Sequence, residues 1–158
     1  KIMATTIIPS DLTVTISESY TVNGVSYGNT MNKTYASNGQ VSQRVMNIAG
    51  KGGSGITFTN ILALSTVDGQ GQVVKADYKY FRITNLDNAN TLNLRVYNGS
   101  DYVAMEVTPA STFLLMDASI DSPASGTAAI VFADITAIAG QSSDATAGVD
   151  IEFLMVTA

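Results

Sequence analysis

Apolar and polar residues alternate along most of this chain. Residues 12–17 read Leu-Thr-Val-Thr-Ile-Ser, which has the two-residue period of a strand with one covered face. Tyr20 and Val22 extend the apolar face to Asn23-Gly24. Asn-Gly is typical of a type I′ hairpin turn, because both central residues need positive φ. The pattern predicts a hairpin whose return strand starts at Val25 and bends at Gly28-Asn29.

The same alternation recurs through the rest of the chain, between turns rich in Gly, Asn and Asp. Residues 128–138 fit either a strand, because Ile130 to Phe132 are contiguous, or a helix, because Ala is frequent there. Residues 140–148 are small and predict a loop. Further strands are expected at residues 31–35, 40–48, 56–64, 73–84, 92–97, 102–107, 112–116 and 149–155.

This pattern predicts the fold class. About eight to ten short strands without a long helical period indicate an all-β protein, an antiparallel β-sandwich, of which the jelly roll is one form. The length of 158 residues suits one domain. We expect residues 1–11 to form an extended N-terminal arm that ends at Pro9-Ser10-Asp11, and residues 12–158 to form a single β-sandwich domain.

Composition limits the chemistry that the chain can perform. It contains no His, no Cys and no Trp, whereas most chemistry near neutral pH uses an imidazole, a thiolate or a metal that they hold. Charged residues make up only 13% of the chain, well below the usual share of about 25%. We therefore expect a non-enzymatic protein that buries surface between copies, as a homo-oligomer. A trimer or larger assembly would cover the edges of its sheets.

Charge is divided unevenly along the sequence. All 8 basic residues lie at or before Arg95, and the chain has a net charge of −5. We call residues 1–95 the basic half and residues 96–158 the acidic half. The two halves could pair within one fold, or they could form unlike faces that attract each other between copies. The acidic balance argues against nucleic acid as a partner. The longest apolar stretch, residues 128–139, contains Asp134 and is shorter than the roughly 20 residues of a membrane span, so no membrane partner is expected.

Two loops superficially resemble ligand-binding motifs. Gly50 to Gly55 lacks the P-loop pattern, because Val45 stands where the first glycine should be and Gly52 follows Lys51. Asp117 to Asp121 resembles the start of a calcium loop, yet Ser122 and Ala128 occupy the positions of the required Gly and Glu. We expect a flexible loop and a solvated acidic loop, with Asp144 and Asp150 able to supplement a calcium site only if the fold brings them close.

The remaining candidates are carboxylates and tyrosines. A pair among Asp77, Glu106 and Asp134 could cleave glycosides if it were held at a fixed separation, but nothing in the sequence identifies a pair. The tyrosines could form a recognition surface or lie at sheet margins with a solvated hydroxyl: Tyr20, Tyr27, Tyr35, Tyr78, Tyr80, Tyr97 and Tyr102. No catalytic, cofactor-binding or metal-binding residue is predicted, and no cofactor.

Four segments of the chain carry a family resemblance: Tyr80 to Asp87, the strand Leu92 to Val96, the closing segment Val149 to Leu154, and the opening Leu12 to Ile16. They resemble segments of small virion proteins of tailed bacteriophages. The low charge, the lack of Cys and the β segments rich in Thr, Ser and Asn are similar as well.

The resemblance implies a β-rich protein of the virion, of the capsid decoration (cement) type, which binds the major capsid protein or other virion proteins at the capsid surface and stabilises the shell. A neck, tail or fibre component, a receptor- or glycan-binding module and a bacterial filament subunit stay open as alternatives. The arm of residues 1–11 could add a strand to a neighbour's exposed edge.

Overall fold

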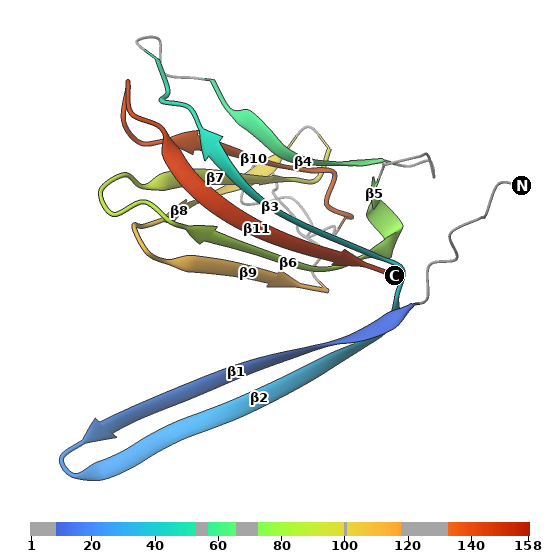
Figure 1. Ribbon diagram of the computed structural model, residues 1–158, viewed down its shortest axis with the longest axis vertical. Helices are drawn as coiled ribbons and strands as arrows, with labels where there is room; N and C mark the ends of the chain where they lie inside the picture. Colours follow the sequence, from blue (N-terminus) through green and yellow to red (C-terminus); the bar gives the residue numbers. More distant parts are fainter. Residues whose placement is uncertain (1–8, 53–56, 66–72, 100, 118–132) are drawn as a thin grey trace, which may run out of the picture. The chain divides into compact units, whose positions relative to one another are not determined.

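The computed structural model describes residues 9–52, 57–65, 73–99, 101–117 and 133–158 (Figure 1). They form β-strands and a single short 3₁₀ turn, η1 (Lys75–Asp77). The chain divides into two compact units: one is Lys1–Gln40 with Ala158, and the other is Val41–Thr157. The arm expected for residues 1–11 lies largely outside the described residues, and its last two residues, Ser10 and Asp11, belong to the first strand.

The first unit contains a long antiparallel hairpin of β1 (Ser10–Val22) and β2 (Val25–Asn38). The predicted turn is confirmed: Val22 pairs with Val25, and Asn23 and Gly24 have φ angles of 50° and 79°. The expected bend at Gly28 does not interrupt β2. A Cβ atom on Gly28 would lie 2.4 Å from the carbonyl oxygen of Glu18, so this glycine permits close pairing of the strands.

The other strands form two sheets (Figure 1). One sheet has the order β3-β11-β6-β9 and the other has the order β5-β4-β10-β7-β8. The predicted antiparallel β-sandwich is confirmed, with one short parallel pair between β4 and β5. The strands are β3 (Gln40–Ile48), β4 (Thr59–Ser65), β5 (Val73–Val74), β6 (Tyr78–Asn85), β7 (Leu92–Tyr97), β8 (Tyr102–Val107), β9 (Thr112–Met116), β10 (Ala137–Ser142) and β11 (Val149–Thr157).

The strand pairs of the sandwich are nested in sequence. Leaving aside the two-residue β5, the first strand pairs with the last (β3 with β11) and the second with the seventh (β4 with β10). The third pairs with the sixth (β6 with β9), and the two middle strands, β7 and β8, form a hairpin. The chain therefore resembles one long antiparallel ribbon folded over on itself, whose successive pairs alternate between the two sheets.

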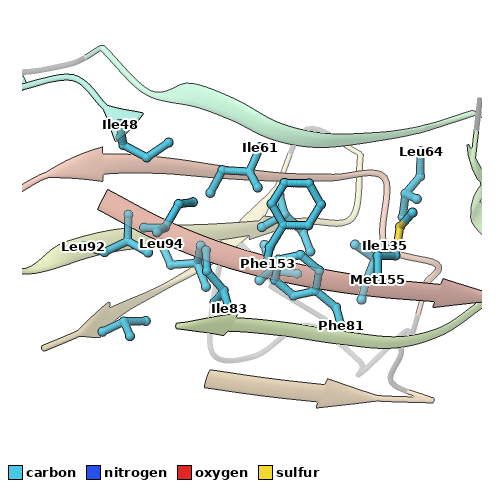
Figure 2. Close-up of a cluster of buried hydrophobic side chains, with 14 of the residues drawn as sticks. Ile48, Ile61, Leu64, Phe81, Ile83, Leu92, Leu94, Ile135, Phe153 and Met155 are labelled. Atoms are coloured by element: carbon cyan, nitrogen blue, oxygen red, sulfur yellow. The ribbon is translucent and has the colours of Figure 1, made fainter. Parts of the chain in front are cut away.

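The core lies between these two sheets (Figure 2). Alternate residues of each strand point inward, as in β7, where Leu92, Leu94 and Val96 are buried while the residues between them are partly exposed. Phe81 of β6 stacks with Phe153 of β11, with ring centroids 6.1 Å apart. The larger buried side chains come from both sheets: Ile48, Ile61, Phe81, Ile83, Leu92, Leu94, Ile138, Ile151, Phe153 and Met155.

Three sequence-based expectations need correction. Residues 73–84 are not one strand, because η1 separates β5 in one sheet from β6 in the other. The segment 140–148 is only partly a loop, since β10 continues to Ser142. Of residues 128–138, the part up to 132 lies outside the described residues, and the strand begins at Ala137, so the helical alternative is wrong for the described end.

The two halves of unlike charge are interleaved in the sandwich. β7 from the basic half pairs with β8 and β10 from the acidic half. Ion pairs join the halves, Lys75 with Asp134 at 3.3 Å and Arg82 with Glu152 at 3.4 Å. The structure thus favours pairing within one fold over two separate faces of opposite charge.

Candidate functional site

The two faces of the β1–β2 hairpin differ sharply in chemistry. One face carries Thr, Ser and Asn side chains that bond across the strands. The Thr15 hydroxyl donates to Asn32 Oδ1 at 2.7 Å, and hydroxyl pairs join Thr13 to Thr34 and Ser17 to Thr30. Since its polar groups pair with each other or face water, this face suits solvent.

The opposite face is largely apolar, and we call it the apolar face of the hairpin. Tyr20, Val22, Val25, Tyr27 and Met31 are 46–57% exposed. Most of the other large apolar side chains in the described part of the chain are better covered. The face comprises Val14, Ile16, Glu18, Tyr20 and Val22 of β1 and their direct partners Lys33, Met31, Asn29, Tyr27 and Val25 of β2.

Two features make the surface of the apolar face uneven. The rings of Tyr20 and Tyr27 stack across the strands, with centroids 5.3 Å apart and an interplanar angle of 13°. Nearer the base, Ile16, Glu18, Asn29 and Met31 line a shallow hollow of about 230 Å³. The face therefore combines a stacked pair of exposed aromatic rings with a neighbouring depression, and another protein surface can match this shape.

A second concave surface lies on the outer face of the five-stranded sheet. The guanidinium group of Arg95 lies between two aromatic rings, 3.8 Å from the centroid of Phe58 and 4.1 Å from that of Tyr102. Its Nε atom is buried and has no hydrogen-bond partner among the described residues. The hollow beside it has a volume of about 500 Å³ and is lined by Phe58, Asn93, Leu94, Arg95, Ala104, Met105, Glu106 and Gln141.

The glycine-rich loop has a structural role at its described end. The backbone N–H groups of Lys51 and Gly52 donate to the carbonyl oxygens of Asp144 and Ala145, both at 2.9 Å. A Cβ atom on Gly50 would lie 2.7 Å from the carbonyl carbon of Thr146. Close backbone contact therefore requires glycine at residue 50. Residues 53–56 lie outside the described part of the loop.

The acidic loop candidates do not come together in a described site. Residues 118–121 lie outside the described residues. Asp144 caps its own turn, because its carboxylate accepts hydrogen bonds from the N–H groups of Thr146 and Ala147, both at 2.7 Å. These bonds lower the pKa of Asp144, with the bond from Ala147 as the largest cause. Asp150 accepts a hydrogen bond from Asn47, and among the described residues no group of acidic side chains could hold a metal ion.

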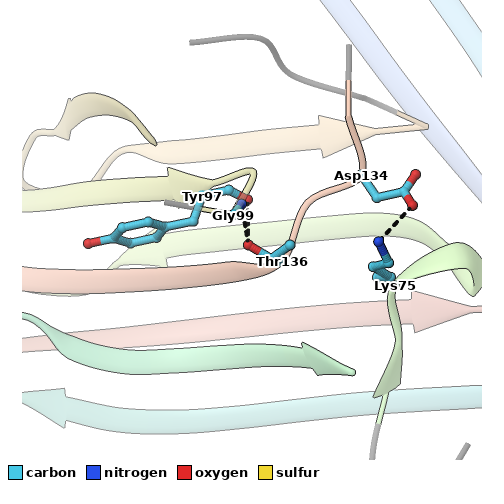
Figure 3. Close-up of polar contacts among 5 residues, drawn as sticks. All are labelled: Lys75, Tyr97, Gly99, Asp134 and Thr136. Atoms are coloured by element: carbon cyan, nitrogen blue, oxygen red, sulfur yellow. Dashed lines mark hydrogen bonds and ion pairs between the residues drawn. The ribbon is translucent and has the colours of Figure 1, made fainter. Parts of the chain in front are cut away.

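The three carboxylates that were candidates for glycoside cleavage lie on different elements. Asp77 lies in η1 and Glu106 on β8 beside the Arg95 hollow. Asp134 precedes β10, where its carboxylate pairs with the ammonium of Lys75 (Figure 3). Thr136, two residues later, accepts a hydrogen bond from Gly99 N–H at 2.8 Å and so holds the β7–β8 turn. The contacts of Asp134 and Thr136 thus serve to fasten one end of the sandwich.

The tyrosines have three different environments. Tyr20 and Tyr27 are exposed on the hairpin, and Tyr97 and Tyr102 pack together with centroids 5.4 Å apart. Tyr78 is buried, and its hydroxyl donates to the carbonyl oxygen of Leu115 at 2.5 Å. The expectation of a solvated hydroxyl is therefore wrong for Tyr78. Burial also raises the pKa of Tyr80, against a smaller opposing effect of Arg82.

Sequence reasoning missed the most distinctive surface. The alternation in β1 and β2 was recognised, but alternation normally means that the apolar side faces a core. A second, polar-faced strand of similar length directly after an Asn-Gly turn is the available signal of a two-stranded ribbon.

In the described part of the chain, no helix has the length and apolar character that a membrane crossing requires. Comparisons with protein-family models, curated proteins and solved structures found no match to this chain.

Proposed function

We propose that this chain is a non-enzymatic structural protein of a phage virion, of the capsid decoration (cement) type, which binds the capsid surface and stabilises the shell by contacts that span subunits. The observation that carries the proposal is the exposed apolar face of the β1–β2 hairpin. Soluble proteins seldom leave a contiguous apolar patch open to water unless it is an interaction site.

The energetics favour assembly through this hairpin. A two-stranded hairpin with no further cover is at best marginally stable in water. Burying its exposed Tyr, Val and Met side chains against another protein gains about 25 cal/mol for each Å² of apolar surface. Because the face carries only two charged side chains, Glu18 and Lys33, little desolvation of charge opposes that gain. The hairpin is therefore suited to protein contact.

The sandwich supports the same proposal. Its strand orders, β3-β11-β6-β9 and β4-β10-β7-β8 with β5 added at one edge, match the nested arrangement of a jelly roll. Viral capsid and lectin domains commonly have that fold. The support is an analogy at the level of fold, since one fold hosts many functions.

The partners that follow from the proposal are the major capsid protein or other virion proteins, together with further copies of this chain. Weak contacts repeated over many copies on a shell add up through multivalency. A neck, tail or fibre position uses the same kinds of contact. The trimer expected from sequence is untested, and sedimentation equilibrium of the full chain distinguishes it from a dimer.

One observation favours a second candidate function, a receptor- or glycan-binding module. The Arg95 hollow combines hydrogen-bond donors on Arg95 and Asn93 with the carboxylate of Glu106 and the Phe58 ring. Such a mixture suits a polyhydroxylated ligand. A glycan array separates the two candidates: binding that disappears in an Arg95→Ala variant favours the module.

Co-sedimentation with shells tests the main proposal. The shells are assembled from the major capsid protein encoded in the same genome. We expect the protein to sediment with them at a fixed ratio. A Tyr20→Ser, Tyr27→Ser, Met31→Ser variant should bind at least about tenfold more weakly, whereas Ser19→Asn on the polar face should bind as the natural chain does. Failure of the natural chain to bind shells, or full binding by the triple variant, would contradict the proposal.

A further inference from the structure

The two charged residues of the apolar face lie four residues apart along the strands. The pair Ile16–Met31 lies midway between them, next to Glu18–Asn29, which is the middle pair of the face. Glu18, paired with Asn29, lies two residues nearer the turn, and Lys33, paired with Val14, lies two residues nearer the base. Each charge is therefore about 7 Å along the strands from the Ile16–Met31 pair, in opposite directions.

This placement is self-complementary in one arrangement of two copies. If two apolar faces pack together with their hairpins antiparallel, about a two-fold axis through the Ile16–Met31 level, Glu18 of each copy lies opposite the Val14–Lys33 level of the other. Glu18 and Lys33 then meet diagonally across the interface, twice. A parallel arrangement separates the same charges by about 14 Å along the strands and forms neither ion pair.

We propose that two copies of this chain pair through the apolar faces of their hairpins, antiparallel and centred on Ile16 and Met31. An isologous contact needs a surface that is complementary to itself, and the Glu18–Lys33 pattern meets that condition without any other partner. The hollow lined by Ile16, Glu18, Asn29 and Met31 adjoins the axis, where it can receive a side chain of the second copy.

The pairing adds to the proposed function. The pairing of two copies is inferred from the hairpin alone, whereas the biological use of the pair rests on the proposed function. Each pair carries two sandwich units. The apolar faces are buried against each other in such a pair, so its two sandwich units are the parts that contact neighbouring shell subunits, and the second contact forms at a high effective concentration. Assemblies built in this way contain an even number of copies.

Charge reversal tests the pairing in the full chain, without shells. Sedimentation equilibrium should show a dimer, or a multiple of it. Glu18→Lys and Lys33→Glu should each weaken self-association at least about tenfold, because each creates two like-charge contacts. The double variant E18K/K33E should restore association to within about threefold of the natural chain. A merely structural role for either residue would not produce this recovery.

A second set of variants tests the face itself. Ile16→Lys places two ammonium groups beside the axis and should give monomers with an intact sandwich, judged by circular dichroism. Ser19→Lys introduces the same charge on the polar face and should leave association unchanged. A natural chain that is monomeric at about 100 μM, which implies a weak contact, would overturn the pairing. So would a trimer, or association that Ile16→Lys leaves intact.

Spin labels test the orientation of the two hairpins. Because the chain has no Cys, single-cysteine variants carry one label per copy. On the polar face, labels at Thr21→Cys should lie about 40 Å apart in an antiparallel pair and labels at Ser17→Cys about 25 Å apart. Equal distances at both sites would indicate a parallel pair and overturn the proposal. A natural chain that stays monomeric but binds shells would contradict the pairing alone, and a paired chain that ignores shells would contradict the proposed function alone.

Discussion

The side-chain amide of Asn85 donates a hydrogen bond to the backbone carbonyl oxygen of Val107 at 3.0 Å, which joins β6 of one sheet to β8 of the other. The same amide donates to the carbonyl oxygen of Asn90 at 2.9 Å, and its Oδ1 accepts from Asp87 N–H at 2.9 Å. Asn85 is completely buried. It is thus a fully bonded polar group that fastens the two sheets at one end of the core.

Asn85→Asp should therefore destabilise the sandwich strongly. The substitution keeps the size of the side chain but removes both donors and leaves a carboxylate facing two carbonyl oxygens. We expect a loss of about 3 kcal/mol or more in the free energy of unfolding, measured by urea denaturation. Asn60→Asp, at an exposed site on β4, is the control and should change stability by less than about 0.5 kcal/mol. Equal effects of the two substitutions would show that the cross-sheet bonds contribute little.

Gly50→Ala should also lower stability, for a steric reason. The added Cβ would lie 2.7–2.9 Å from backbone atoms of Ala145 and Thr146, and backbone cannot move aside as a side chain does. We expect a loss of about 2 kcal/mol, with faster amide exchange at Lys51 and Gly52, whose N–H groups bond to the same loop. An unchanged melting temperature would mean that the two loops separate readily.

Acidification should remove a contribution from Asp144. Its pKa is lowered in the folded protein, chiefly by the N–H groups of Ala147 and Thr146, so the unfolded chain binds its proton more readily. The contribution is therefore complete above the unfolded pKa of about 3.9 and is lost as pH falls through the lower folded value. Asp144→Asn should be less stable than the natural chain at neutral pH, and the difference should vanish in strong acid. A constant difference across this titration would contradict the assignment.

Arg95→Lys tests the aromatic clamp on the outer face. The planar guanidinium contacts both Phe58 and Tyr102, whereas an ammonium group cannot stack on two rings at once. We expect a loss of about 1 kcal/mol in the free energy of unfolding. Arg44→Lys is the control, because it makes the same substitution at an exposed position of β3, away from Phe58 and Tyr102. It should have almost no effect on the free energy of unfolding. A similar loss in both variants would indicate that the rings do not stabilise Arg95.

The parts of the fold that sequence predicts well are those that local chemistry determines. The turn at Asn23-Gly24 follows from the φ angles that these residues tolerate, and the alternation in β7 directly gives its buried face. Gly140 is predicted to lie in a loop but lies in β10, because its place in the fold depends on distant residues rather than on local chemistry. A Cβ atom there would lie 2.9 Å from Cδ1 of both Ile61 and Leu92, so this strand glycine is explained by packing against residues distant in sequence.

The candidate sites depend on such distant contacts even more. Phe58 and Arg95 are separated by 37 positions in the sequence, and no local pattern indicates that they stack. Nor does periodicity reveal that η1 carries the chain from β5 in one sheet to β6 in the other. In the hairpin, alternation identified an apolar face correctly, yet a strand pattern has the same appearance whether that face meets its own core or another molecule.

Hydrogen exchange should separate the hairpin from the sandwich. The β1–β2 sheet contains only these two strands, and the apolar side chains towards its turn are exposed. Its amides should therefore exchange through local opening at least about tenfold faster than those of β6 and β7 in dilute solution. Concentrating the protein should slow exchange in the hairpin alone, since pairing of copies stabilises the closed hairpin by mass action. The Ile16→Lys variant is the control, because its exchange should not depend on concentration. Uniform protection across hairpin and sandwich in the dilute protein would contradict this account and would indicate that the hairpin is already covered within a single copy.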